Sequence, residues 1–170
     1  MAIFVGGVEK PFKILQVAYD NKASTESTSN LASAGNFADV MSVNITPTAS
    51  SSTIIISAMI NTGASDSSNG SCILRCLRDS TQIAGGTASG SRISTTTGRG
   101  QDNQGTNTNN TLCVEWIDSP STTSQVTYKI QFAARGGGSG TAYIGQTATD
   151  GNSTENQRTP CHLRLTELGA

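Results

Sequence analysis

The sequence predicts an all-β fold, an antiparallel β-sandwich or jelly roll of about eight strands. Apolar and polar residues alternate along the whole chain, which is the period of a strand with one buried face. Ser, Thr, Asn and Gly make up more than two fifths of the 170 residues, as expected for strands joined by turns. No segment has the composition or period of a convincing helix, and residues 24–40 are expected to hold one helical turn at most.

The chain is expected to form one sandwich domain over residues 12–170. No linker-like segment divides it, and no repeat of fixed period indicates a propeller or solenoid. Residues 1–11, "MAIFVGGVEKP", are expected to form an N-terminal arm outside the core, because Gly6, Gly7 and Pro11 should break any strand there. This arm is a candidate attachment segment.

Alternation places the first two strands at 12–19 and 38–46. "FKILQVAY" (12–19) opens the domain with Phe12 and Ile14 among its apolar residues. "ADVMSVNIT" (38–46) turns Val43 and Ile45 inward. The neighbouring Val40 and Met41 indicate either an irregularity in the strand or burial on both faces.

Two apolar strands follow at 52–60 and 71–79. "STIIISAMI" (52–60) is almost continuously apolar, as in a central strand covered on both faces. "SCILRCLRD" (71–79) should place Cys72, Leu74 and Cys76 on one face, and "QIAGG" should return beside it as a short hairpin.

The second half predicts one weak strand and four clearer ones. "SRISTTT" (91–97) is the weak strand, and a long polar connection follows it over 98–110. "TLCVEWI" (111–117) should send Leu112, Val114 and Trp116 to one face. "QVTYKIQFAA" (125–134) alternates most cleanly, with Val126, Tyr128, Ile130 and Phe132 directed inward. A short "TAYIG" strand (141–145) and a closing "CHLRLTEL" strand (161–168) complete the domain.

Charge argues against two classes of partner. The net charge is −1, and Lys and Arg are scattered singly, so no basic surface for nucleic acid or an anionic membrane is expected. No apolar stretch is long enough for a spanning helix, and no membrane insertion is expected. The N-terminus lacks the pattern of a signal peptide, so we expect synthesis in a cytoplasm without export.

The four cysteines are expected to be reduced, buried thiols. Cys72, Cys76, Cys113 and Cys161 form no C-x-x-C pair, and a single histidine is too few for a zinc site. Such thiols pack as small apolar side chains. A disulfide remains open, although the spacing does not require one.

No catalytic, cofactor-binding or metal-binding residues are predicted, and the protein is not expected to be an enzyme. His162 adjoins Cys161 in a strand, where neighbouring side chains point to opposite faces, and an approach of Cys113 to His162 is a remote alternative. The Gly-rich segments 84–92 and 135–140 lack the sequence of a phosphate loop. "DGNSTE" (150–155) only partly matches a calcium loop, so a plain turn is the favoured interpretation.

Four segments carry a resemblance to a known family: "KILQV" (13–17), "SVNITPTASSSTIIISAMI" (42–60), "DSPSTTSQVTYKIQF" (118–132) and "RLTEL" (164–168). In order and composition they resemble a domain of bacteriophage virion surface proteins, especially those of cyanophages and other marine phages. The similarity covers most of residues 12–168. Members of this family are often the terminal heads of tail fibres and are thought to be trimeric β-sandwiches.

The resemblance implies a homotrimeric virion protein that contacts other phage virion proteins and the host surface. Tail-fibre members usually follow a long shaft, whereas this domain begins close to Met1, so residues 1–11 are expected to provide the attachment. Two placements stay open: the head of a tail fibre or baseplate appendage, and a capsid decoration protein. The polar segments 61–70, 98–110 and 146–160 are candidates for binding a host surface glycan. A carbohydrate-binding or polysaccharide-degrading module is a further alternative.

Overall fold

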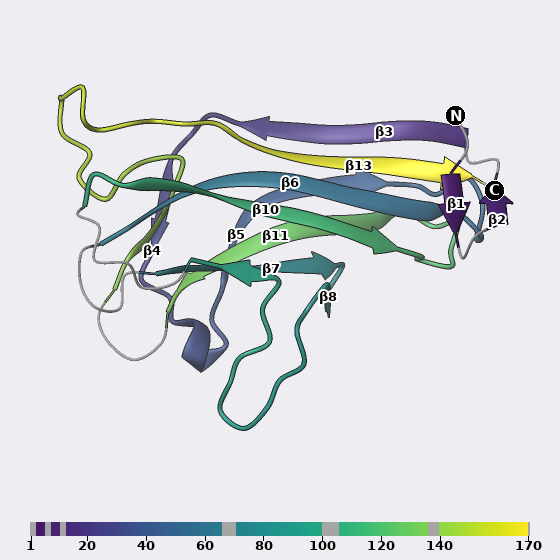
Figure 1. Cartoon of the computed structure of the whole chain (residues 1–170), viewed down its shortest axis with the longest axis horizontal. Helices are drawn as coiled ribbons and strands as arrows, with labels where there is room; N and C mark the ends of the chain where they lie inside the picture. The colour runs from purple at the N-terminus through teal and green to yellow at the C-terminus, as the bar shows by residue number, and fades with distance from the viewer. Residues whose placement is uncertain are drawn as a thin grey trace.

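The computed structural model describes residues 3–5, 8–10, 13–65, 71–99, 106–135 and 140–169 (Figure 1). Nearly all regular structure in these residues is β-strand. The strands are β1 (Ile3–Val5), β2 (Val8–Lys10), β3 (Lys13–Lys22), β4 (Glu26–Thr28), β5 (Ala38–Ile45), β6 (Thr53–Ala64), β7 (Cys72–Arg78), β8 (Thr81–Ile83), β9 (Thr97–Gly98), β10 (Asn109–Asp118), β11 (Val126–Ala134), β12 (Ala142–Ile144) and β13 (Cys161–Gly169). The expected helical turn is the short 3-10 helix η1 (Ala32–Ala34), which ends at Gly35 with a φ of 72°.

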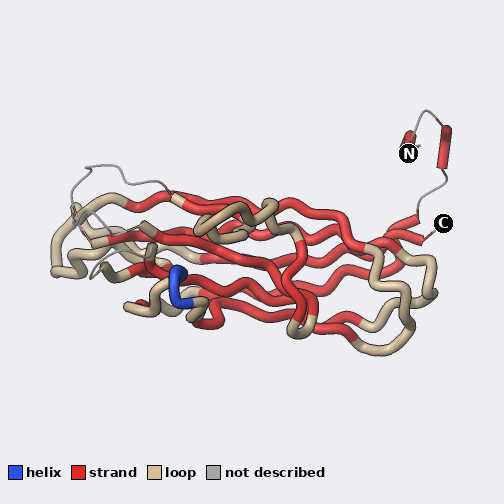
Figure 2. Tube along the Cα trace, turned by 90° about the horizontal axis from the view of Figure 1, so that it is seen from below, coloured by secondary structure: helices blue, strands red, loops and turns tan. Residues whose placement is uncertain are grey.

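Two antiparallel sheets face each other across the core. We call the first sheet I, in which β10, β6, β13 and β3 lie side by side in that order. The short β12 pairs with the last residues of β6, past the end of the β6–β13 pairing, and β4 pairs with β12. The second, sheet II, contains β5, β11 and β7, with β8 and β9 on the free edge of β7. Figure 2 shows the two layers running along the length of the molecule.

The strand pairs are nested, and this nesting makes the fold a jelly roll. β3 pairs with β13, β5 with β11, β6 with β10, and β7 with β8 and β9. The first and last strands of the sandwich, β3 and β13, therefore pair with each other, and each inner pair falls in the opposite sheet from the pair before it. Such a rolled ladder of antiparallel pairs is the jelly-roll arrangement. The predicted all-β, antiparallel sandwich is confirmed.

The core consists of the alternating apolar residues of both sheets. On β11, Val126, Tyr128, Ile130 and Phe132 are all buried, as the sequence predicts. They pack in one cluster with the inward residues of β6, β7 and β13, namely Ile54, Ile56, Ile60, Cys72, Leu74, Cys76, Leu163 and Leu165. Burial of this many aliphatic and aromatic side chains is the main term that stabilises the sandwich.

A β-bulge explains the two adjacent apolar residues of β5. Met41 lies opposite Ile130 and Asp39 lies opposite Gln131, so Val40 is the extra residue between them. Because a bulge inserts one residue into the ladder, two consecutive side chains can face the core. Val40 and Met41 are only 6% and 4% exposed. The predicted irregularity at this position is therefore confirmed.

Two local predictions are wrong. Residues 91–97 do not form a strand, since only Thr97–Gly98 pairs with β7. The segment has one apolar residue, Ile93, and its backbone instead receives a hydrogen bond from Gln82 Nε2 to the Ser94 carbonyl at 3.2 Å. The short strand β4, which pairs with β12, lies in a Ser- and Thr-rich segment where alternation gave no signal.

A polar link joins the two sheets near the end of β10. Asp118 on sheet I accepts a hydrogen bond from Tyr128 Oη at 2.6 Å and pairs with Arg78 Nη1 at 2.8 Å, both on sheet II. Burial raises the pKa of the Tyr128 hydroxyl, and its hydrogen bond to Asp118 raises that pKa further. The hydroxyl therefore stays a donor, and the largest core side chain keeps its polar atom satisfied.

The segment before the sandwich contains a strand pair. β1 and β2 pair with Ile3 opposite Lys10 and Val5 opposite Val8, so the expectation that Gly6, Gly7 and Pro11 prevent any strand there is wrong. Two three-residue strands flank positions 6 and 7 instead. Figure 2 shows this pair beyond the end of the sandwich, on the side where both chain ends lie. The division into an arm (1–11) and a domain (12–170) remains a proposal.

Candidate functional site

No reactive cluster forms among the described residues. In residues 13–65, 71–99, 106–135 and 140–169, no three His, Cys, Asp or Glu side chains come together as a metal site would require. Cys113 on β10 and His162 on β13 both lie opposite Met59, on either side of β6. Two strand spacings therefore separate their backbones by roughly 10 Å. Within the described ranges, no helix is long and apolar enough to cross a membrane.

Three of the four thiols are buried, and Cys113 is exposed, which corrects the expectation for that residue. All four are free cysteines. Burial raises the pKa of Cys72 and of Cys76 to about 12, and it also raises the pKa of Cys161. Because the thiolate is the reactive form, these three sulfurs are chemically quiet parts of the core.

A buried carboxylate, Glu167, ties β13 to the neighbouring β3 and to the segment after β5. It accepts hydrogen bonds from Gln16 Nε2 at 2.5 Å and from the Thr48 backbone N–H at 2.7 Å. Burial alone would raise the pKa of Glu167, but hydrogen bonds from Ser52, Gln16 and Thr48 together hold it below the ordinary value. These hydrogen bonds join three segments that are distant in the sequence, which gives Glu167 a structural role.

The segment between β12 and β13 lies at the end of the sandwich away from both termini (Figure 1). Its residues line a polar depression. We call it the loop depression. It has a volume of about 430 Å³ and is lined by Asp150, Gly151, Asn152, Ser153, Asn156 and Arg158. Arg158 holds Asp150 through both carboxylate oxygens, at 3.1 and 2.5 Å, and this hydrogen bonding lowers the pKa of Asp150.

The hydrogen bonds of Asn156 and Glu155 indicate which polar atoms of the loop already have protein partners. Asn156 donates from Nδ2 to the Gly151 carbonyl at 3.0 Å, while its Oδ1 has no hydrogen-bond partner although no solvent reaches it in this conformation. Glu155 is drawn to another loop, where it accepts from Asn107 Nδ2 at 3.2 Å. With Asp150 held by Arg158, both carboxylates of "DGNSTE" have protein partners, which fits a turn better than a calcium loop.

The loop is anchored to its neighbours rather than projecting freely. Gln146 and Arg158 form a β-bridge, and the Thr149 N–H donates to the Thr106 carbonyl at 3.1 Å. Below it, β6 passes so closely at Gly63 that a Cβ there would lie 2.4 Å from the Gln146 carbonyl oxygen. The loop depression therefore rests on the end of sheet I.

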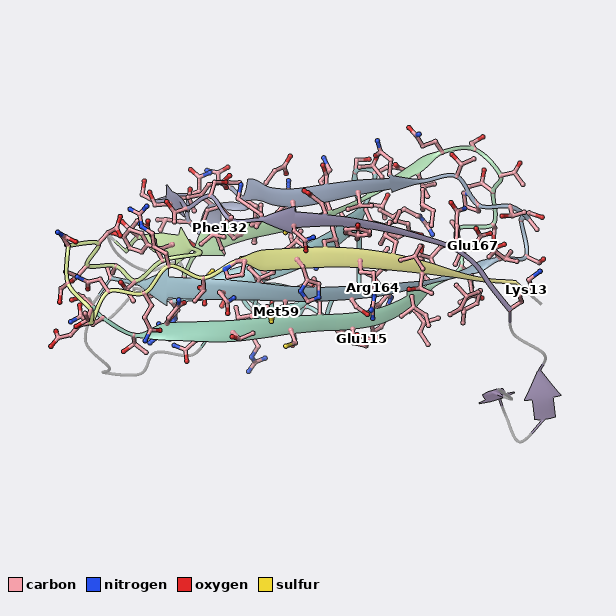
Figure 3. All side chains as sticks on the ribbon, turned by 90° about the horizontal axis from the view of Figure 1, so that it is seen from above. Lys13, Met59, Glu115, Phe132, Arg164 and Glu167 are labelled. Carbon is pink, nitrogen blue, oxygen red and sulfur yellow. The ribbon has the colours of Figure 1, made fainter. Side chains whose placement is uncertain are left out.

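The outer face of sheet I is a second unusual surface (Figure 3). Seven large apolar side chains are exposed among the described residues, and six of them belong to β3 and β10, the two edges of this sheet: Ile14, Leu15, Val17, Tyr19, Trp116 and Ile117. Trp116 was expected beside Leu112 and Val114 in the core, yet it is 45% exposed. Alternation identifies the residues on one side of a strand. On an edge strand such as β10, a side chain on the core side can still be exposed because no further strand lies beside it.

Side chains on this face line up in rows across the strands. One row runs Ile117, Ile55, Thr166, Val17, and the next runs Glu115, Ser57, Arg164, Tyr19. At the β10 edge the surface is hollowed by about 400 Å³ between the outward-facing Ile55, Glu115 and Ile117 and the ring of Trp116, which is on the other side of β10; we call this the Trp116 hollow. The second face of "STIIISAMI" is thus only half-buried, at Ile55 and Met59, rather than fully covered.

No protein-family model matches the chain, and no curated protein matches it. Among solved structures, it is similar to VP2 of infectious bursal disease virus. A D431N mutant in derived T=1 particles is 13% identical, with 91% of this chain and 36% of that chain covered and a TM-score of 0.38. A VP2 subviral particle is 16% identical, with coverage of 90% and 41% and a TM-score of 0.39.

A third structure, of the Gx strain of the same virus, is 12% identical, with coverage of 97% and 43% and a TM-score of 0.39. This chain therefore spans 43% or less of the length of these three proteins. The likeness is one of overall β architecture.

Proposed function

We propose that this protein is a bacteriophage virion surface protein, the homotrimeric head of a tail fibre or baseplate appendage that binds the host surface without catalysis. The resemblance at residues 13–17, 42–60, 118–132 and 164–168 supports the phage origin. The jelly roll supports a binding role, because this fold is widely used for viral capsid and lectin domains. Synthesis in the host cytoplasm and incorporation into the virion belong to the same proposal.

The observation that carries the proposal is that the candidate attachment segment and the loop depression lie at opposite ends of the molecule. The β1–β2 pair and both chain ends lie at one end of the sandwich, and the loop depression lies at the other (Figures 1 and 2). Attachment through residues 1–11 would turn the loop depression outward, away from the particle. Binding sites are commonly built on loops that a rigid scaffold presents in this way.

The loop depression has the chemistry to bind sugar hydroxyl groups. Asn152 and Ser153 are exposed and provide donors and acceptors, and the half-buried amide of Asn156 lies beside them. The Asp150–Arg158 pair would fix the shape of the surface while keeping charged hydrogen-bonding atoms near the ligand. A host surface glycan is therefore the ligand class we propose.

Binding of the purified protein to host cells and isolated host polysaccharide tests this proposal. Asn152→Ala with Asn156→Ala should weaken binding at least tenfold, because two amide groups of the depression are lost. Ser89→Ala with Thr87→Ala, in the exposed segment between β8 and β9, is the matched control and should bind normally. Equal binding by both double variants would contradict the assignment of the site, and absence of any host binding would contradict the host-contact role.

Capsid decoration is the second candidate, and the exposed apolar face of sheet I favours it as a surface for seating on a shell. Copy number separates the two roles. Quantitative mass spectrometry of purified particles should find few copies for a tail head and hundreds for a decoration protein. Release of sugars from host polysaccharide by the purified chain would instead support the degrading alternative.

A further inference from the structure

The outer face of sheet I combines three features that point to a protein partner. Val17 is 49% exposed, Tyr19 68% and Ile117 64%, and they lie within two adjacent cross-strand rows. Large apolar side chains gathered on one face mark an interaction surface far more often than scattered ones. The matching side chains of sheet I on its inner face, such as Ile54 and Ile56, are fully buried.

The edges of the sheet are also open. Among the described strands, β3 pairs only with β13 and β10 only with β6, which makes them two ten-residue edge strands. Proteins usually protect such edges with lysine, proline or bulges. β10 contains neither Lys nor Pro. β3 has lysine at its two ends, Lys13 and Lys22, and a bulge at Leu15, so the protected part of this edge is near its ends. These edges have the character of strands that a neighbouring chain covers.

Shape and charge on the two edges are complementary. The β10 side carries the Trp116 hollow with the carboxylate of Glu115 in its wall, and Glu115 accepts a hydrogen bond from Ser57 Oγ at 2.8 Å. The β3 side carries the protruding Tyr19 ring, with Arg164 as its cross-strand neighbour. Glu115 and Arg164 lie on either side of Ser57 and form no ion pair with each other within the chain.

We propose that the outer face of sheet I is the contact between copies of this chain, with Tyr19 of one copy entering the Trp116 hollow of the next. In that contact Arg164 approaches Glu115 of the neighbouring copy, and Val17 meets Ile117. The two surfaces differ, so the contact is head-to-tail, and a head-to-tail contact closes into a ring when the rotation permits. This gives the homotrimer of the proposed function a specific interface. It does not depend on host binding.

Sedimentation equilibrium and light scattering of the purified full chain over a concentration series test this interface. The wild type should show three times the 17.5 kDa chain mass. Tyr19→Ser and Ile117→Lys should each shift the protein to the monomer or weaken association at least tenfold, because each removes a central apolar contact. Ile93→Lys, an exposed apolar side chain outside this face, is the matched control and should keep the wild-type mass.

Charge reversal distinguishes loss of the interface from loss of folding, because a misfolded single variant would not regain association when the second charge is also reversed. Glu115→Arg and Arg164→Glu should each weaken association about tenfold, since each places like charges in contact. The double variant should restore it. Circular dichroism should remain unchanged in all these variants, because the replaced side chains lie on the outer face.

A wild-type chain that stays at 17.5 kDa, or an oligomer that Tyr19→Ser and Ile117→Lys leave intact, would overturn the inference. Retention of host binding by such a monomer would show that the failure concerns the interface alone. A mass of two chains would overturn the head-to-tail contact and the homotrimer, because a dimer is built on a two-fold, isologous interface.

Discussion

Phe132 is 1% exposed and lies in the middle of the core cluster, opposite Leu74 on β7. We expect Phe132→Ala to lower the free energy of unfolding by about 3–5 kcal/mol, because the substitution removes a buried ring and leaves a cavity. Chemical denaturation measures this change. Ile93→Ala, at a 41% exposed position, should cost less than about 0.5 kcal/mol. A loss below about 1 kcal/mol for Phe132→Ala would contradict the core assignment.

The thiols give a second prediction at the level of single residues. Cys113 should react quickly with a thiol reagent in the native protein, and Cys72, Cys76 and Cys161 should react only after unfolding, because burial raises their pKa values and blocks access. Mass spectrometry after a short labelling pulse counts the modified sites. Cys113→Ser should abolish the fast reaction. Rapid native labelling of Cys72 or Cys161 would show that the sandwich opens more readily than its packing implies.

Glu167 makes folding stability depend on pH. Since hydrogen bonds lower its folded pKa below the ordinary value of 4.5, its contribution is complete above that pH and is lost as the pH falls through the lowered pKa. At neutral pH, Glu167→Gln should destabilise the protein by about 1–3 kcal/mol, because an amide faces donors that need an acceptor. The difference from the wild type should shrink below pH 4.5.

Denaturation at neutral and acidic pH measures this difference. Glu155→Gln, in the exposed loop between β12 and β13, is the control and should differ little from the wild type at either pH. If the gap between Glu167→Gln and the wild type stays the same at both pH values, hydrogen bonding to the carboxylate is not its source.

Much of the residue-level burial could be predicted from alternation, and the failures share one cause. Val126, Tyr128, Ile130 and Phe132 are buried as predicted because sheet II is covered along that whole face. Trp116 also alternates with buried residues, yet it lies on an edge strand. Alternation reports which side chains share a face and carries no information about what covers it. The exposure of Tyr19 and Ile117 could not be read from sequence for the same reason.

At the scale of elements, alternating segments were predictable, including the short β8 and β12, whereas the Ser- and Thr-rich β4 and β9 were not. β5, β6, β7, β10, β11 and β13 all fall on predicted strands, and the bulge at Val40 was marked by two adjacent apolar residues. The nested order of pairs was not predictable, because it joins segments such as β3 and β13 from opposite ends of the chain. The loop depression was likewise hidden, since its shape depends on contacts with β6 and with residues 106–107.

The contact between β6 and the loop above it gives an element-level prediction. Gly63→Ala should destabilise the protein by about 1–3 kcal/mol, because the added Cβ would overlap the Gln146 carbonyl and crowd Thr147. Hydrogen exchange should increase in residues 146–149 before the rest of the sandwich. Gly86→Ala, where no atom lies within 4 Å of the added carbon, is the control and should be nearly neutral. Equal stability of the two variants would contradict this packing.

At the scale of the whole molecule, the account rests on a jelly roll with different surfaces assigned to different partners. The β1–β2 pair and residues 1–11 are proposed for attachment, the outer face of sheet I for contacts between copies, and the loop depression for the host glycan. The exposed residues of sheet I and the residues that line the loop depression are absent from the core cluster, so both surfaces can be altered without removing core contacts. This separation makes the proposed roles independently testable.

Cryo-electron microscopy of the intact virion tests the central claim most directly. The account predicts jelly-roll density in groups of three at the tip of a tail fibre or baseplate appendage, with the loop depression directed away from the particle. Density for this chain distributed over the capsid would contradict the tail-head role. Its absence from the purified virion would contradict the structural role altogether.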